Sequence, residues 1–201
     1  GSVVEGDTIY LGNQTWNSGN WGPWDANQVV KVNIPNLIIS GGTSGSPNDF
    51  ATISAGSKIF QLNAPGITLK NIAFTNTAQG PCCAVNIQSS DSTITNCVFD
   101  HCNNQNGAAI YGSSSSSNAK IENCNFTNNE AIWGGKGTVY YEGSDLTITG
   151  SIFDANIGGA VYSEGDTEIT DCIFEDHTGD KIIVDLHGTA KVTNSNFTNN
   201  N

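Results

Sequence analysis

The nine residues Ile-Glu-Asn-Cys-Asn-Phe-Thr-Asn-Asn at positions 121–129 decide the fold, because their pattern recurs along the chain. Aligning the sequence on Phe126 gives six equivalent phenylalanines, spaced 25, 27, 27, 21 and 23 residues apart: Phe74, Phe99, Phe126, Phe153, Phe174 and Phe197. Five positions before each phenylalanine lies an aliphatic residue: Leu69, Ile94, Ile121, Ile148, Ile169 and Val192. Such self-similarity, at a period of about 20 to 50 residues, is typical of a solenoid.

Two further positions of the repeat predict how the chain turns. Three residues before each phenylalanine lies Asn, Asp or Gly, the residues that best tolerate a left-handed backbone: Asn71, Asn96, Asn123, Gly150, Asp171 and Asn194. We therefore expect a bend there between two short strands, whose alternating apolar residues each bury one face. A further short strand is expected in each repeat: 85–87, 109–111, 139–141, 160–162 and 182–184.

These patterns predict an all-β fold, a right-handed single-stranded parallel β-helix of about eight rungs. Stacked rungs would align the phenylalanines and the aliphatic residues into two core columns. A leucine-rich repeat is disfavoured, because no helical half is present. A β-sandwich is the main rival, but it does not explain why the same residue class recurs in aligned columns.

The domain prediction has two parts. Residues 1–28 form an N-terminal leading strand and a Trp-rich capping loop, and residues 29–201 form the β-helix rungs. The opening Gly1-Ser2 reads as a cloning scar and residues 199–201 stop in mid-pattern. We therefore expect a piece of a larger protein, truncated at its C-terminus and monomeric.

Composition limits the partners. The 201 residues contain seven lysines, no arginine and 19 acidic residues, for a formal net charge of −12. This charge disfavours nucleic acids and anionic membranes, and no apolar run reaches the roughly 20 residues of a membrane span. Without arginine to hold carboxylates, acidic polysaccharides are also poor ligands. The bias toward Asn, Ser and Thr favours an extracellular location.

The cysteines suggest packing rather than chemistry. Cys97, Cys124 and Cys172 share one inward position with serines, and small buried thiols behave as apolar core residues. Among the loop cysteines, Cys83, or its neighbour Cys82, could form a disulfide with Cys102. No Cys-x-x-Cys pair is present, so we expect no metal site and no cofactor.

Titratable side chains give weak signals for catalysis. His101 and His177 each follow an aspartate and are predicted to be solvated turn residues. Asp154 and Glu175 directly follow column phenylalanines, and paired carboxylates can hydrolyse glycosides. Any polar β-helix face offers such pairs, however, so we expect no catalytic residue and no enzyme.

Aromatic residues are the candidates for ligand binding. Trp16, Trp21 and Trp24 lie within nine residues, and Trp133 lies in another predicted loop. They form either a platform on which sugars stack or, for the N-terminal three, a plug over the first rung. An aligned outward ladder is also predicted, which is either a ligand stripe or ordinary ring stacking: Tyr111, Tyr140 and Tyr162.

The stretches Glu-Gly-Asp-Thr-Ile-Tyr-Leu-Gly-Asn at 5–13 and Asn-Ile-Pro-Asn-Leu-Ile-Ile-Ser-Gly-Gly at 33–42, with 121–129, resemble β-helix regions of adhesin-like surface proteins. Methanogenic archaea carry many of these, and bacterial polymorphic outer-membrane proteins use similar rungs. The resemblance covers nearly the whole chain. It implies a secreted or cell-wall-anchored protein that contacts carbohydrate or another surface component of other cells, of a host or of plant material.

The resemblance transfers no catalytic residue, because the Asn-Thr-Asp, Asp-Asp, Gly-His-Gly and Arg-Ile-Lys motifs of polygalacturonase-type β-helices are all missing from the sequence. The expected function is therefore a non-enzymatic cell-surface adhesin domain. A polysaccharide-degrading enzyme and a purely structural stalk are the alternatives.

Overall fold

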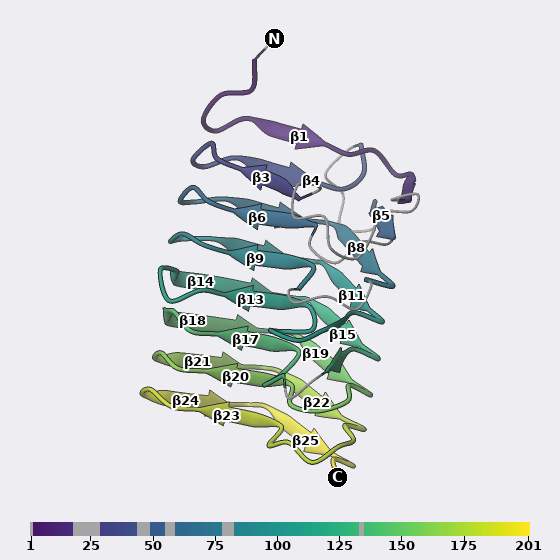
Figure 1. Ribbon diagram of the computed structural model, residues 1–201, viewed down its shortest axis with the longest axis vertical. Coiled ribbons are helices and arrows are strands. Elements are labelled where there is room, and N and C mark those ends of the chain that lie inside the picture. Colours follow the sequence, from purple (N-terminus) through teal and green to yellow (C-terminus); the bar gives the residue numbers. More distant parts are fainter. Residues whose placement is uncertain (1, 18–28, 44–48, 55–58, 78–82, 133–134) are drawn as a thin grey trace.

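The computed structural model is a stack of short strands, with the two ends of the chain at opposite ends of the stack (Figure 1). It describes residues 2–17, 29–43, 49–54, 59–77, 83–132 and 135–201. In these ranges all regular structure is β-strand, and no helix is long and apolar enough to span a membrane.

Three parallel sheets form the faces of the stack. The first sheet contains β1 (Thr8–Tyr10), β4 (Ile38–Ser40), β7 (Thr68–Lys70), β10 (Thr93–Thr95), β14 (Ser117–Glu122), β18 (Ser144–Thr149), β21 (Thr167–Thr170) and β24 (Ala190–Thr193). The second contains β2 (Thr15–Asn17), β5 (Ala51–Ser54), β8 (Ile72–Thr75), β11 (Val98–Asp100), β15 (Asn125–Thr127), β19 (Ile152–Asp154), β22 (Ile173–Glu175) and β25 (Asn196–Thr198). The third contains β3 (Val30–Val32), β6 (Phe60–Leu62), β9 (Val85–Ile87), β13 (Ile110–Gly112), β17 (Val139–Tyr141), β20 (Val161–Ser163) and β23 (Val184–Leu186). Two short strands, β12 (Asn103–Asn104) and β16 (Glu130–Ala131), pair separately.

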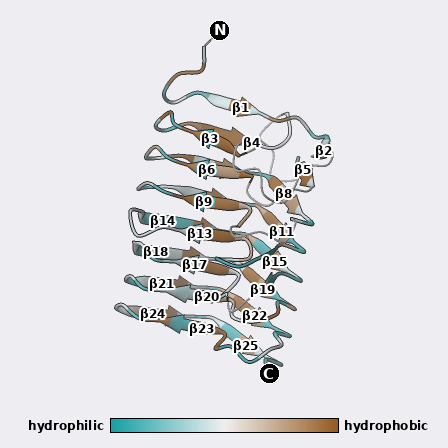
Figure 2. Ribbon diagram, in the orientation of Figure 1, coloured by the Kyte–Doolittle hydropathy of each residue, from teal (hydrophilic) through white to brown (hydrophobic). Residues whose placement is uncertain are grey.

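The strand order shows that the chain visits the three sheets in turn and then begins the next rung. Every sheet neighbour therefore comes from an adjacent rung, which is the topology of a parallel β-helix. The predicted fold class is thus confirmed. Figure 2 shows hydrophobic colour on strands such as β3, β6 and β9, whereas β14, β15 and β23 are largely hydrophilic.

The phenylalanine column runs through the core of the second sheet. Successive rings from Phe74 to Phe197 stack with centroids 4.5–4.9 Å apart and planes within 12° of parallel. The register pairs each ring with the next, as in Phe99 with Phe126. The fully buried members of the two predicted columns are Leu69, Ile94, Ile121, Ile148, Ile169, Phe74, Phe99, Phe126, Phe153 and Phe174.

The last rung departs from this prediction. Val192 is 42% exposed and Phe197 is 47% exposed, although both columns predict burial. They lie on β24 and β25, and no described strand follows to cover them. Each side chain therefore has a neighbouring rung on one side only.

The bends fall where the sequence predicts them. All six residues three positions before a phenylalanine have a positive φ, between 49° and 58°: Asn71, Asn96, Asn123, Gly150, Asp171 and Asn194. A second left-handed position, two residues after each phenylalanine, escaped prediction: Asn76, His101, Asn128, Ala155, Asp176 and Asn199. Each pair of bends directs the residue that follows the second bend into the core.

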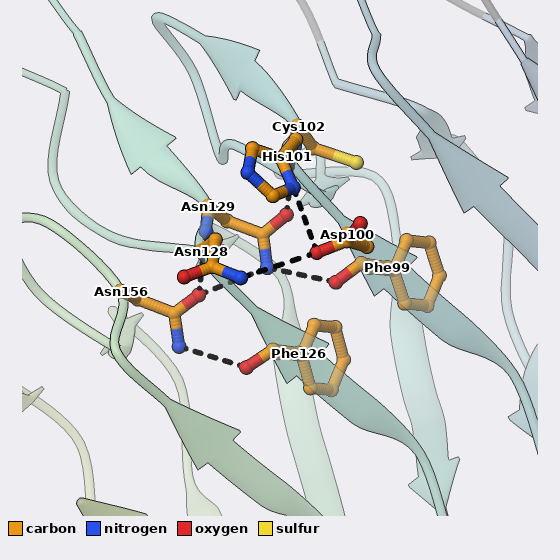
Figure 3. Close-up of polar contacts among 8 residues, drawn as sticks. All are labelled: Phe99, Asp100, His101, Cys102, Phe126, Asn128, Asn129 and Asn156. Atoms are coloured by element: carbon orange, nitrogen blue, oxygen red, sulfur yellow. Dashed lines mark hydrogen bonds and ion pairs between the residues drawn. The ribbon is translucent and has the colours of Figure 1, made fainter. Parts of the chain in front are cut away.

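That inward residue builds a polar ladder inside the turn (Figure 3). The backbone N–H of Cys102 donates to Asn129 Oδ1 (2.9 Å), and that of Asn129 donates to Asn156 Oδ1 (2.9 Å). The amide nitrogen of Asn129 donates to the carbonyl of Phe99 (3.0 Å), and that of Asn156 to the carbonyl of Phe126 (2.9 Å). Each asparagine thus joins two rungs, which satisfies backbone groups that the bend removes from the sheets.

Two predictions fail at this ladder. His177 is fully buried rather than solvated, because it occupies the ladder position of its rung. Its Nδ1 accepts the N–H of Asn156 (3.1 Å), while its Nε2 is buried without a partner. Cys102 lies at the same position two rungs above Asn156 and is a buried free thiol, so the candidate disulfide with Cys83 is not formed. Cys82, the alternative partner, lies outside the described residues. His101, in contrast, is exposed and pairs with Asp100 (2.8 Å).

Candidate functional site

The outer face of the first sheet carries two rows of polar side chains. Because Ile94, Ile121 and Ile148 point into the core, the residues before them on each strand point outward. One row lies on the strands: Thr93, Lys120, Thr147, Glu168 and Lys191. The other lies where these strands start, at the residues three positions before the inward aliphatic residue. Asp91 and Asp166 precede β10 and β21, and Asn118 and Asp145 are the second residues of β14 and β18.

Between the rows the surface is hollowed. A hollow of about 290 Å³ is lined by Asp91, Thr93, Asn118, Lys120, Asp145 and Thr147. A second, of about 250 Å³, is lined by Asp145, Leu146, Thr147, Asp166, Thr167, Glu168, Thr189 and Lys191. Asp145 and Thr147 line both hollows, so the two adjoin and together make a concave strip that crosses the strands from β10 to β24. We call it the polar groove.

Most charged groups at the two ends of the polar groove already have partners. Asn118 Nδ2 donates to Asp91 Oδ1 (3.1 Å), and hydrogen bonds from Ser90 and Asn118 lower the pKa of the Asp91 carboxyl. The backbone N–H of Thr189 donates to Asp166 (2.7 Å). Lys191 Nζ pairs with Glu168 Oε1 (2.6 Å).

Two charged groups, Asp145 and Lys120, make no direct contact of this kind, although Lys120 is close enough to Asp91 to help lower the pKa of its carboxyl. Among the described residues, neither the Asp145 carboxylate nor the Lys120 ammonium makes a hydrogen bond or an ion pair. A carboxylate accepts hydrogen bonds and an ammonium donates them. With the hydroxyls of Thr93 and Thr147, they offer both kinds of contact to a ligand rich in hydroxyl groups.

The predicted tyrosine ladder exists on the outer face of the third sheet, but neighbouring side chains cover the faces of its rings. Tyr111 and Tyr140 have ring centroids 5.3 Å apart, Tyr140 and Tyr162 5.2 Å, and Tyr162 and His187 4.9 Å. Lys136 Nζ lies 4.0 Å from the Tyr162 ring centroid and donates to the Tyr162 hydroxyl (2.8 Å). Tyr140 and Tyr162 are each only 8% exposed, so their rings offer no open face on which a sugar could stack.

Carboxylates hold the tyrosine hydroxyls in place. Glu142 accepts hydrogen bonds from Tyr111 (2.6 Å) and from Tyr140, and Glu164 accepts one from Tyr162 (2.5 Å). Burial, with the nearby Glu142 carboxylate, raises the pKa of Tyr140 well above its usual range. The hydrogen bond with Tyr162 raises the pKa of Lys136. These contacts are those of ordinary stacking, one of the two interpretations of the ladder.

The structure describes one of the four candidate tryptophans. Trp16 lies in β2, not in a loop, and its register partner Ile53 pairs in turn with Phe74. Trp16 therefore stands at the first position of the phenylalanine column, 47% exposed, with Nε1 donating to the carbonyl of Leu11 (3.2 Å). Trp21, Trp24 and Trp133 lie outside the described residues.

The structure also shows where the predicted carboxylate pair and the three core thiols lie. Asp154 and Glu175 are directly opposite each other on β19 and β22, but neither lines the polar groove. Cys97, Cys124 and Cys172 are buried, and each thiol donates to a carbonyl two residues earlier (3.3 Å). Burial raises the pKa of Cys124 and of Cys172, which disfavours the reactive thiolate.

The described residues offer no arrangement of side chains that would bind a metal ion. Those residues contain no group of three or more His, Cys, Asp or Glu side chains arranged to hold an ion. The polar groove itself escaped prediction, since polar residues one and three positions before an inward aliphatic residue are ordinary for a solvated strand. The recurrence of these polar residues at the same two positions in successive rungs was the sequence signal that could have revealed the groove.

Comparison with known proteins gives one result on family. A family model described as "Right handed beta helix region" matches residues 6–137 and 115–201. None of the curated proteins compared with the chain matches it.

Proposed function

We propose that this chain, which belongs to the right-handed β-helix family, is a non-enzymatic, extracellular adhesin domain that binds carbohydrate at the cell surface. The family includes both adhesins and polysaccharide-degrading enzymes. The polar groove supports the proposal, because it is an elongated hollow in which the Asp145 carboxylate and the Lys120 ammonium make no hydrogen bond or ion pair with another described residue. Ligand sites in proteins are typically concave and carry a few well-placed polar groups.

The location of the groove modifies the expected contact site. Trp21, Trp24 and Trp133 stay predictions as sugar contacts, and Trp16 stands over the end of the core. We assign the first contact to Asp145, Thr147 and Lys120 instead.

The first experiment is binding of the folded domain to an array of microbial, host and plant glycans. Thr147→Lys places a long side chain at the junction of the two hollows, where Lys120 already occupies the same row one rung earlier. We expect this variant to lose at least tenfold in affinity for any glycan that the array identifies. Thr127→Lys is the matched control, because Thr127 is an outward residue on the second sheet with the same change of charge. Equal binding by both variants would remove the groove from the proposal.

The non-enzymatic part is tested separately. Glycans bound on the array are incubated with the domain and assayed for new reducing ends and for unsaturated products. Turnover that disappears in Asp154→Asn or Glu175→Gln would overturn the proposal in favour of a glycoside-cleaving enzyme.

A second candidate function is a stalk that spaces a binding tip from the cell. The uninterrupted stack of phenylalanine rings favours it, because such a column makes each rung support the next. A blank array with a fully folded protein would favour the stalk over the adhesin.

A further inference from the structure

We propose that the polar groove binds a straight, uncharged, β-1,4-linked glycan lying along the axis of the solenoid. This inference rests on the proposed carbohydrate-binding function and specifies its ligand class. Three observations carry it: the repetition of the lining, its length, and its charge.

The lining repeats from rung to rung. Each rung from β10 to β21 supplies an amide or carboxylate where the strand starts and a hydroxyl or charged group two residues later, such as Asp91 with Thr93 and Asp145 with Thr147. The register places equivalent strand positions directly opposite one another. Similar groups therefore recur about every 4.8 Å along one line. A polymer of identical units can meet such a series repeatedly, whereas a single sugar meets only one member.

The groove is long and straight. It crosses five strands, from β10 to β24, which corresponds to about 19 Å along the axis at the usual strand spacing. Glycans with β-1,4 linkages are extended ribbons that can follow a straight line of contacts. Glucose chains with α-1,4 linkages coil, and they would leave the line after a few units.

The charge of the lining selects against anionic polymers. Four carboxylates face two lysines, and Lys191 is already paired with Glu168. Uronate or sulfated chains would meet repulsion along the groove, added to the net charge of −12. The unpartnered groups, Asp145 and Lys120, can both be satisfied by neutral hydroxyls. Among the described residues no aromatic side chain lines either hollow, so the ligand is held by hydrogen bonds from its edges.

The test is calorimetric titration of the whole chain with oligosaccharides of increasing length. The probes are β-1,4-linked glucose, xylose and mannose oligomers, with α-1,4-linked glucose oligomers and galacturonate oligomers of the same lengths. For at least one β-1,4 series, we expect affinity to rise with length until the oligomer spans about 19 Å and then to level off. The α-linked and galacturonate series should bind at least tenfold more weakly.

Two variants locate the contact. Lys120→Thr introduces the residue found at this position in both neighbouring rungs, Thr93 and Thr147. Asp145→Asn introduces the residue found one rung earlier, Asn118, and keeps a side chain that tolerates the positive φ of 60°. Each should weaken the longest β-1,4 oligomer about tenfold, the loss expected for one hydrogen bond to a charged group. The Thr127→Lys control should bind like the wild type.

The outcomes separate this inference from the proposed function. Binding that does not depend on length, or that favours α-linked or galacturonate oligomers, overturns the axial ligand and leaves carbohydrate binding intact. The same holds if the β-1,4 series fail while another glycan binds on the array. If no glycan binds in either experiment, both proposals fail.

Discussion

Replacing His177 with asparagine should stabilise the protein. His177 fills a ladder position that Asn129, Asn156 and Asn200 occupy in other rungs. Asparagine there both accepts the backbone N–H of the preceding rung and donates to a phenylalanine carbonyl, as Asn200 does to Phe174 (2.9 Å). Histidine makes only the first of these bonds and leaves Nε2 buried without a partner.

The magnitude follows from these two differences. A new hydrogen bond to the carbonyl of Phe153 is worth about 1 kcal/mol, and removing a buried unpartnered donor recovers about 1–3 kcal/mol. The smaller side chain gives up some packing, so we expect a net gain of about 1–2 kcal/mol. For a chain of this size that raises Tm by roughly 2–8 °C.

The pH dependence gives a second readout of His177. Burial lowers the pKa of His177 below its ordinary value of 6.5, and the nearby carboxylates of Asp154 and Asp176 only partly oppose this. Below pH 6.5 the unfolded chain therefore binds a proton that the folded chain rejects, so wild-type stability falls as the pH drops through this range. The His177→Asn variant lacks this loss, and its advantage should widen between pH 7 and pH 5.

The assay is reversible unfolding in urea, followed by circular dichroism at both pH values. His101→Asn is the matched control, because His101 is exposed and Asn76 and Asn128 occupy its turn position in the neighbouring rungs. It should change stability by less than about 0.5 kcal/mol. A His177→Asn variant no more stable than wild type, or an advantage that shrinks on acidification, would refute the reasoning.

Three further predictions concern the core and its turns. Ala155 has a φ of 51° where other rungs place mostly Asn, so Ala155→Asn should stabilise by about 0.5–1 kcal/mol in urea unfolding, and a loss of stability would contradict this. Phe126→Ala should destabilise by about 3–5 kcal/mol and Phe197→Ala by less than half as much, because only the first ring is buried between two others; equal losses would show that exposure of the last rung is irrelevant. Cys124 and Cys172 should resist alkylation at neutral pH and react in denaturant, as read by mass spectrometry of peptides, whereas rapid native labelling would contradict their burial.

The columns and the first bend were predictable because they follow from side-chain chemistry that repeats. An inward Phe or Ile in every rung gives an unmistakable period, and Asn or Gly at a fixed offset indicates a left-handed bend. The ladder was not predictable from apolar alternation, because it is an inward column of polar residues. Cys102 and His177 look like loop residues until Asn129 and Asn156 are aligned with them.

The polar groove illustrates a different limit. Each lining residue is ordinary for a solvated strand, and the hollow arises from the relative heights of neighbouring side chains across rungs. The sequence gives the order of these residues but not the depth of the hollow that their side chains enclose. For Trp16 the sequence left two interpretations open, a sugar platform or a plug over the first rung, and its register places it at the end of the core column, where a plug would lie.

The orientation of the hydrogen bonds has a mechanical consequence. All three sheets bond rung to rung, and the two ends of the chain lie at opposite ends of the stack (Figure 1). A force applied between these ends therefore peels one strand at a time instead of shearing a whole sheet. The rungs between the six column phenylalanines, of 21 to 27 residues, would each release about 70–90 Å of chain when they yield. Under load the domain would lengthen in a staircase of similar steps, absorbing a sudden pull while its remaining rungs keep their shape.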